Sequence, residues 1–225
     1  MAFEQNGSQV APAAANILKL SRKCRMKIFE SVLIVPHQLY IFRDPGCPIE
    51  LFAPDKPRGW PALIHTNRQI NREAAAVLYG MNNFNFLDTS RGQPDLLEAF
   101  LSCIGPANAS LISRVCINFP VIEGGPGTFE LRDDSVKSLR LLREHCPHVQ
   151  TIETHVQRKN SNGMIDSSRD EVASVKEALL RFDDELKFGL PFLSTIIVRF
   201  YTGYPTPDVL REMEVFGWKI LRANE

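Results

Sequence analysis

Residues 63–86 read LIHTNRQINREAAAVLYGMNNFNF, a helical pattern that changes directly into a strand pattern. The apolar residues of the first part recur at intervals of three and four, which predicts one buried face of a helix. Pro61 suits the first turn of that helix, and Gly80 is expected to end it. Residues 83–87 then alternate, which predicts a strand with Phe84 and Phe86 on one face. We therefore expect a helix–strand unit over residues 61–87 that packs a helix on a sheet.

The sequence before this unit predicts a helix and a hairpin. Residues 1–15 are small and polar and are expected to form a disordered tail. Over 16–36 the apolar spacing predicts a helix from about 21 to 34 with Ser21 as its N-cap, and with its basic residues on the wet face. Residues 38–42 and 49–52 read as two short strands joined by the turn residues of 44–46.

After residue 87 helical and extended patterns alternate. Helices are expected over 94–104, 134–145, 168–187 and 206–216, and strands over 114–119, 151–156, 194–201 and 218–221. Such alternation favours right-handed crossovers and a largely parallel sheet. The predicted fold class is thus α+β or α/β: an N-terminal helix and β-hairpin, then a mixed sheet with alternating helix–strand units in a degenerate leucine-rich-repeat-like stack. Residues 37–225 are expected to form a single mixed α/β domain.

The amino-acid composition restricts which classes of function are compatible with the sequence. The 225 residues carry 26 Lys and Arg against 26 Asp and Glu. This balance argues against general electrostatic binding of nucleic acid, which usually requires a basic excess. The five cysteines form no CxxC pair, and no secretory signal or membrane-spanning run is visible, so we expect reduced thiols and a cytoplasmic or nuclear protein.

Two groups of residues near the end of the predicted helix 134–145 are candidate reactive sites. His145, Cys146, His148 and His155 crowd metal donors into a short stretch, but they end different elements and are not expected to converge on a metal. Cys146 lies beside His145 on a helix, where neighbours point about 100° apart, so the pair is not expected to act as nucleophile and base. The sequence therefore predicts no catalytic residue, no metal and no cofactor.

Residues 63–86 also carry a family signature. They resemble a large fungal family of F-box-like proteins of unknown function, whose pattern is TxRQI…EA…LYxxNxFxF. The residues expected to serve this signature structurally are Arg68, Gln69, Ile70, Glu73, Tyr79, Asn82, Phe84 and Phe86. Arg68 and Glu73 are expected to tie neighbouring loops by charge-assisted hydrogen bonds, and Tyr79 to bury its ring while its hydroxyl finds a partner.

The helix within 16–36 resembles a degenerate F-box helix. The resemblance implies a protein-interaction module without enzymatic activity, in the manner of an F-box-like substrate receptor that docks a Skp-type adaptor of a cullin-type ubiquitin ligase. The apolar face expected to meet this partner comprises Leu18, Leu20, Ile28, Phe29, Val32 and Leu33. One stripe on a helix is also what burial in a core requires.

Two other classes of function stay open from sequence. One is an enzyme whose site has no recognisable motif, which would require a pocket holding titratable groups. The other is a chromatin or nucleic-acid accessory protein that binds through the basic cluster of residues 22–27. Neither a membrane partner nor a small-molecule ligand is expected.

Overall fold

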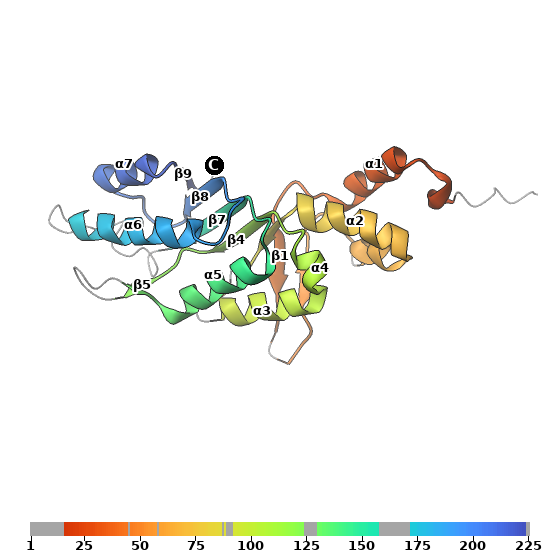
Figure 1. Ribbon diagram of the computed structural model, residues 1–225, viewed down its shortest axis with the longest axis horizontal. Helices are drawn as coiled ribbons and strands as arrows, with labels where there is room; N and C mark the ends of the chain where they lie inside the picture. Colours follow the sequence, from red (N-terminus) through yellow and green to blue (C-terminus); the bar gives the residue numbers. More distant parts are fainter. Residues whose placement is uncertain are drawn as a thin grey trace, which may run out of the picture.

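A computed structural model of the chain describes residues 16–44, 46–57, 59–86, 88, 92–123, 130–157 and 172–223. The expected tail at residues 1–15 lies outside this part. A seven-stranded sheet in the order β2-β1-β3-β4-β7-β8-β9 forms the centre, and a two-stranded sheet pairs β5 with β6. Figure 1 shows α3, α5 and α6 along one side of the large sheet, with α1 and α2 extending beyond its end. The mixed α/β fold class with alternating helix–strand units is confirmed.

The elements follow the predicted order closely. The α-helices are α1 (Arg22–Leu33), α2 (Arg68–Met81), α3 (Gln93–Ile104), α4 (Pro106–Ala109), α5 (Asp133–His145), α6 (Val172–Lys187) and α7 (Pro207–Val215), and the 3₁₀-helices are η1 (Ile17–Lys19) and η2 (Trp60–His65). The strands are β1 (Leu39–Phe42), β2 (Glu50–Phe52), β3 (Asn83–Asn85), β4 (Arg114–Asn118), β5 (Ile122–Glu123), β6 (Glu130–Leu131), β7 (Thr151–Val156), β8 (Thr195–Phe200) and β9 (Lys219–Arg222). The β1–β2 hairpin is antiparallel, and every other neighbouring pair in the large sheet is parallel.

The single helix expected over 61–80 was wrong in two respects. The segment divides into η2 and α2, because the Asn67 side chain accepts a hydrogen bond from the Ile70 amide at 2.9 Å and starts a new helix. The second helix continues through Gly80 to Met81. Gly80 has no positive φ, so it does not provide the left-handed stop that glycine often gives, and Asn82 is the C-cap instead.

The two faces of the sheet have different character. Because the strands β1, β3, β4, β7, β8 and β9 are added in chain order, right-handed crossovers place their helices on one face. The register aligns a buried apolar row across that face: Leu39, Phe84, Val115, Ile152 and Ile196. Alternate residues point to the opposite face, on which the described residues place no helix and which we call the helix-free face; the corresponding row there is Tyr40, Asn85, Cys116, Glu153 and Ile197. Polar side chains therefore gather on the helix-free face.

Helix α1 is fixed to α2 at both of its ends. Near its start, Arg25 pairs with Glu73 of α2. At its end, the Asn82 amide donates to Leu33 O at 2.9 Å and its oxygen accepts from Val35 N at 2.9 Å. The prediction that all basic residues of α1 lie on a wet face was wrong for Arg25, which is 6 % exposed because its guanidinium finds a carboxylate inside the helix pair.

The structure also bears on membranes. No helix in the described ranges is both long enough and apolar enough to cross a bilayer.

Candidate functional site

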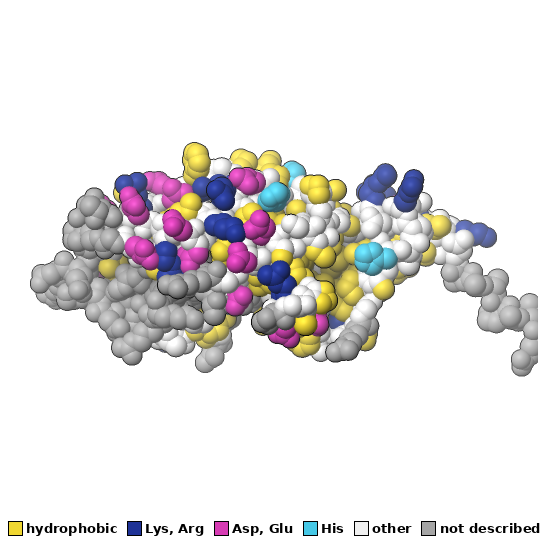
Figure 2. Space-filling view, turned by 90° about the horizontal axis from the view of Figure 1, so that it is seen from below, with side chains coloured by type: hydrophobic (Ala, Val, Ile, Leu, Met, Phe, Trp, Pro, Cys, Tyr) yellow, Lys and Arg dark blue, Asp and Glu magenta, His cyan; other side chains and the backbone are white. Residues whose placement is uncertain are grey.

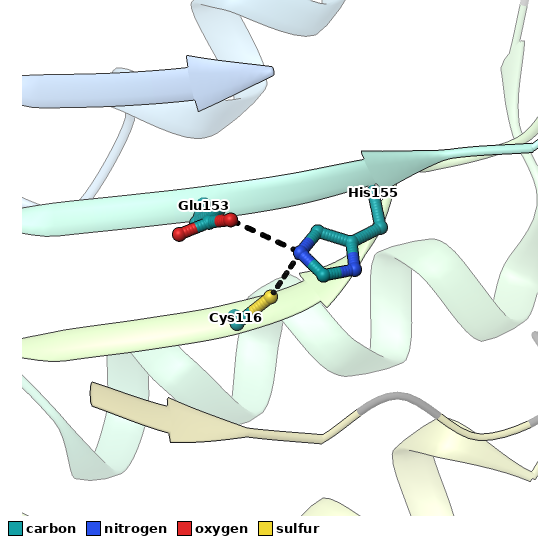
Figure 3. A group of neighbouring side chains, drawn as sticks. All are labelled: Cys116, Glu153 and His155. Carbon is teal, nitrogen blue, oxygen red and sulfur yellow. Dashed lines mark hydrogen bonds and ion pairs between the residues drawn. The ribbon is translucent and has the colours of Figure 1, made fainter. Parts of the chain in front are cut away.

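Three chemically versatile side chains meet on the helix-free face of the sheet. Cys116 of β4 is the cross-strand partner of Glu153 on β7, and His155 follows two residues further on the same strand face. Cys116 Sγ lies 3.0 Å from His155 Nε2, and the same ring nitrogen lies 3.1 Å from Glu153 Oε1. Figure 3 shows the three side chains pointing toward one another from the two strands. Each residue is at most 5 % exposed, so the cluster is nearly dry.

A further layer of polar groups holds the cluster. Arg199 of β8 donates from Nε to Glu153 Oε1 at 2.7 Å. The Gln38 side chain favours the ionised form of the Cys116 thiol and lowers its pKa, and it accepts a hydrogen bond from the Asn85 amide at 2.6 Å. Polar groups therefore face both members of the cluster that can carry negative charge, the thiol and the carboxyl.

The Cys116 thiol and the Glu153 carboxyl have different ionisation states because their pKa values shift in opposite directions. Burial raises the pKa of the Cys116 thiol well above its usual range, and the nearby Glu153 carboxylate raises it further. Burial alone would also raise the pKa of Glu153, but hydrogen bonds from His155 and Arg199 outweigh it and lower that pKa to about 2. At neutral pH the cluster therefore contains a neutral thiol beside an ionised carboxylate.

This geometry differs from that of a nucleophilic triad. In such a triad one imidazole nitrogen faces the nucleophile and the other faces the orienting carboxylate. Here Cys116 and Glu153 share the single nitrogen Nε2 of His155. A protonated thiol is also a weak nucleophile. What the three groups do offer is one sulfur, one nitrogen and one oxygen ligand within 4.8 Å of one another.

The donor set that the sequence singled out does not assemble. Cys146 is fully buried in the apolar core, where burial raises its pKa to about 12. The His148 ring contacts Ser110 O at 2.7 Å and lies against Phe192, and His145 is exposed at the end of α5. Of the four, only His155 belongs to the cluster, and sequence reasoning missed its partners Cys116 and Glu153. The available signal was Glu153-x-His155, two polar residues on one face of a strand expected to be buried.

A second feature is an open groove beside the N-terminal helices, which we call the N-terminal groove. It has a volume of about 1090 Å³ and is bounded by α1, η2, α2 and α4. Its apolar lining comprises Met26, Ile64, Ala75, Ala76, Ala107 and Leu111. Figure 2 shows a hollow with hydrophobic side chains between the N-terminal helices and the rest of the molecule. The small side chains Ala76 and Ala107 leave room for another backbone to approach closely.

The polar lining of the N-terminal groove is basic. Arg22, Arg68 and Arg72 line it and are exposed. Within the described part of the chain, none of the three forms an ion pair with a carboxylate. The one lining carboxylate, Glu73, is held by Arg25. Figure 2 shows Lys and Arg over the N-terminal helices, while both signs of charge mix over α5 and α6.

The expected partner-binding residues divide into two groups. Phe29 and Leu33 are fully buried in the core, whereas Leu18, Leu20 and Val32 are exposed and Ile28 is half-buried. None of these six lines the N-terminal groove.

The signature residues divide similarly. Ile70, Tyr79, Asn82, Phe84 and Phe86 are buried, and Phe84 stacks on Tyr79 with ring centroids 5.8 Å apart. Glu73 forms a charge-assisted bond as expected, but to the helix α1 and not to a loop, and Gln69 donates to its Oε1 at 3.3 Å. The same expectation was wrong for Arg68, which points to solvent at the groove.

Comparisons with known proteins add no assignment. No family model, no curated protein and no solved structure matches the chain.

Proposed function

We propose that the protein is a non-enzymatic protein-interaction module that receives an acidic, amphipathic helical segment of a partner protein in the N-terminal groove. The observation that carries this proposal is the set of three exposed arginines beside an apolar floor. Arginine is the residue enriched where interfaces recognise carboxylates, because its planar guanidinium binds them with two parallel hydrogen bonds.

Shape and charge spacing favour a helical occupant. One turn of helix about 10 Å wide and 5.4 Å long fills roughly 400 Å³, so the groove accommodates about two turns. Arg68 and Arg72 are one turn apart on α2 and lie on one face. Acidic residues spaced by three or four on a partner helix along α2 would meet both, while its apolar side would cover Ala76 and Leu111.

The local charge of this region supports an acidic partner. Residues 16–86 contain ten Lys and Arg against five Asp and Glu, although the chain as a whole is neutral. The resemblance to F-box-like proteins supports the same class of function and names a first partner to test, a Skp-type adaptor of a cullin-type ubiquitin ligase.

The test begins with a photo-crosslinking amino acid at Ala76 in the groove and, as a matched control, at the exposed Leu180 of α6. Crosslinked peptides from a native lysate are sequenced, and a purified Skp-type adaptor is assayed in parallel. We expect a crosslink specific to position 76 in a segment rich in Asp and Glu.

The purified segment is then measured by fluorescence anisotropy. We expect Arg68→Glu with Arg72→Glu to weaken its binding at least tenfold, and Arg140→Glu with Arg181→Glu, two exposed arginines away from the groove, to leave it unchanged. Crosslinking at position 76 to nucleic acid or to residues 1–15 of the same chain would contradict the proposal. So would crosslinks at position 76 that all persist in the Arg68→Glu, Arg72→Glu variant.

A further inference from the structure

The Cys116–Glu153–His155 cluster is independent of the N-terminal groove and has ligand chemistry of its own. We propose that these three residues form a zinc site, with Cys116 Sγ, His155 Nε2 and one Glu153 carboxylate oxygen as protein ligands. Thiolate, imidazole and carboxylate are the three ligand types that Zn²⁺ accepts, and three protein ligands leave the fourth tetrahedral position to water or to an incoming group.

The spacing of the three groups suits this ion. With Zn–S near 2.3 Å and Zn–N and Zn–O near 2.0 Å, tetrahedral angles separate sulfur from nitrogen by about 3.6 Å and nitrogen from oxygen by about 3.3 Å. The present separations are 3.0 Å from Cys116 Sγ to His155 Nε2 and 3.1 Å from that nitrogen to Glu153 Oε1. The shifts required are therefore about 0.6 Å for sulfur to nitrogen and about 0.2 Å for nitrogen to oxygen. All three ligand atoms lie within 4.8 Å of one another, against a tetrahedral sulfur-to-oxygen distance of about 3.5 Å.

The surrounding contacts are those that metal ligands usually have. Ligating carboxylates and thiolates accept hydrogen bonds from an outer layer of donors that orients them. Arg199 Nε donates to the Glu153 carboxylate at 2.7 Å. Arg199 also places a positive charge beside the site. The Cys116 thiolate that forms when zinc binds offsets this charge. Binding releases the Cys116 proton and uses His155 as a neutral imidazole.

The site lies close to solvent. It is on the helix-free face of the sheet, where the Tyr201 ring packs on the His155 ring at 4.6 Å between centroids. Tyr201 itself is 47 % exposed, so the ring that covers His155 borders solvent.

Zinc binding is tested on the full chain with its three exposed cysteines replaced, Cys24→Ser, Cys47→Ser and Cys103→Ser, so that only buried thiols remain. After loading with Zn²⁺ and dialysis, we expect about one ion per chain by mass spectrometry of metals. Competition with a chromophoric chelator measures the affinity. Loading with Co²⁺ instead reports thiolate ligation through a sulfur-to-cobalt charge-transfer band in the near ultraviolet.

Two variants separate the site from its surroundings. In this background Cys116→Ser is expected to abolish the cobalt band and to lower the affinity for zinc at least about 100-fold. This factor is the upper end of the loss caused by replacing a residue that only contacts a metal ligand. Cys146→Ser removes an equally buried thiol outside the cluster and is expected to leave the cobalt band and the zinc affinity unchanged. Circular dichroism checks that each variant folds.

Two results would overturn the zinc site. One is a triple-serine parent chain that is folded by circular dichroism but keeps no zinc and shows no cobalt–thiolate band. The other is metal binding that survives Cys116→Ser. Neither result bears on the N-terminal groove, whose own test uses no metal.

Discussion

Arg25 and Glu73 form a two-point ion pair between α1 and α2. Arg25 Nε donates to Glu73 Oε2 at 2.7 Å and Nη2 donates to Oε1 at 2.6 Å, while Nη1 donates to Leu20 O at 2.6 Å. The two side chains are only 8 % and 12 % exposed. This contact between residues 48 positions apart holds the start of α1 against α2 and so positions one wall of the N-terminal groove.

The first prediction concerns this pair. Glu73→Gln leaves the Arg25 charge nearly buried without its carboxylate, so we expect the free energy of unfolding to fall by about 1–3 kcal/mol. Urea denaturation measures it. The matched control is Glu98→Gln, which removes a more exposed partner of Lys137 and is expected to cost about 0.5 kcal/mol or less. Equal losses in the two variants would contradict the prediction.

The second prediction is the pH dependence of the same contact. The hydrogen bonds from Arg25 lower the pKa of Glu73 from 4.5 to about 2. A carboxylate with a lowered folded pKa stabilises the fold above its unfolded pKa and loses that effect as pH falls toward the folded value. We therefore expect the stability difference between wild type and Glu73→Gln to be full at pH 6 and to shrink between about pH 4.5 and pH 2. A difference that stays constant over this range would count against the ion pair.

Periodicity predicted most of the fold because the helices bury an apolar stripe and the strands have an extended pattern bounded by turn residues. The stripe of α6 and the alternation of β7 and β8 placed these elements within a few residues of their observed bounds. The division between η2 and α2 could not be seen in apolar spacing, since it depends on a hydrogen bond from the Asn67 side chain. Local capping competes with a continuous helix, and the spacing of apolar residues does not report that competition.

The candidate sites were less accessible to sequence reasoning. Cys116 and His155 are 39 residues apart and meet only through the register of β4 against β7. Adjacent residues such as His145 and Cys146 drew attention because they are neighbours in sequence, yet a helix end directs them apart. The N-terminal groove likewise depends on how α1, α2 and α4 pack, and Arg25 and Arg22 differ in role although they lie three positions apart.

The third prediction tests the Asn67 cap. Asn67→Ala removes the acceptor for the Ile70 amide and is expected to lower the free energy of unfolding by about 1 kcal/mol. Asn67→Asp keeps a side-chain oxygen at the start of α2 and is expected to retain most of that stability. Chemical denaturation of the three proteins provides the comparison. An alanine variant as stable as the aspartate variant would show that the cap does not stabilise α2.

The fourth prediction concerns thiol reactivity in metal-free protein. Cys24, Cys47 and Cys103 are exposed, whereas Cys116 and Cys146 are buried and their pKa values are raised. We expect a disulfide reagent to modify three thiols rapidly in the native protein and the other two only upon unfolding. Mass spectrometry of the labelled peptides identifies the positions. Rapid labelling at Cys116 or Cys146 would be inconsistent with the described burial.

The fifth prediction separates the two roles of α1. Phe29 is fully buried, so Phe29→Ala is expected to lower the free energy of unfolding by about 3–5 kcal/mol. Val32 is 37 % exposed, and Val32→Asp is expected to change that free energy by less than about 1 kcal/mol. Thermal and urea denaturation compare the two variants. Because Val32→Asp keeps the fold, any loss of partner binding it causes must come from the surface of α1, and an unfolded Val32→Asp protein would place this residue in the core instead.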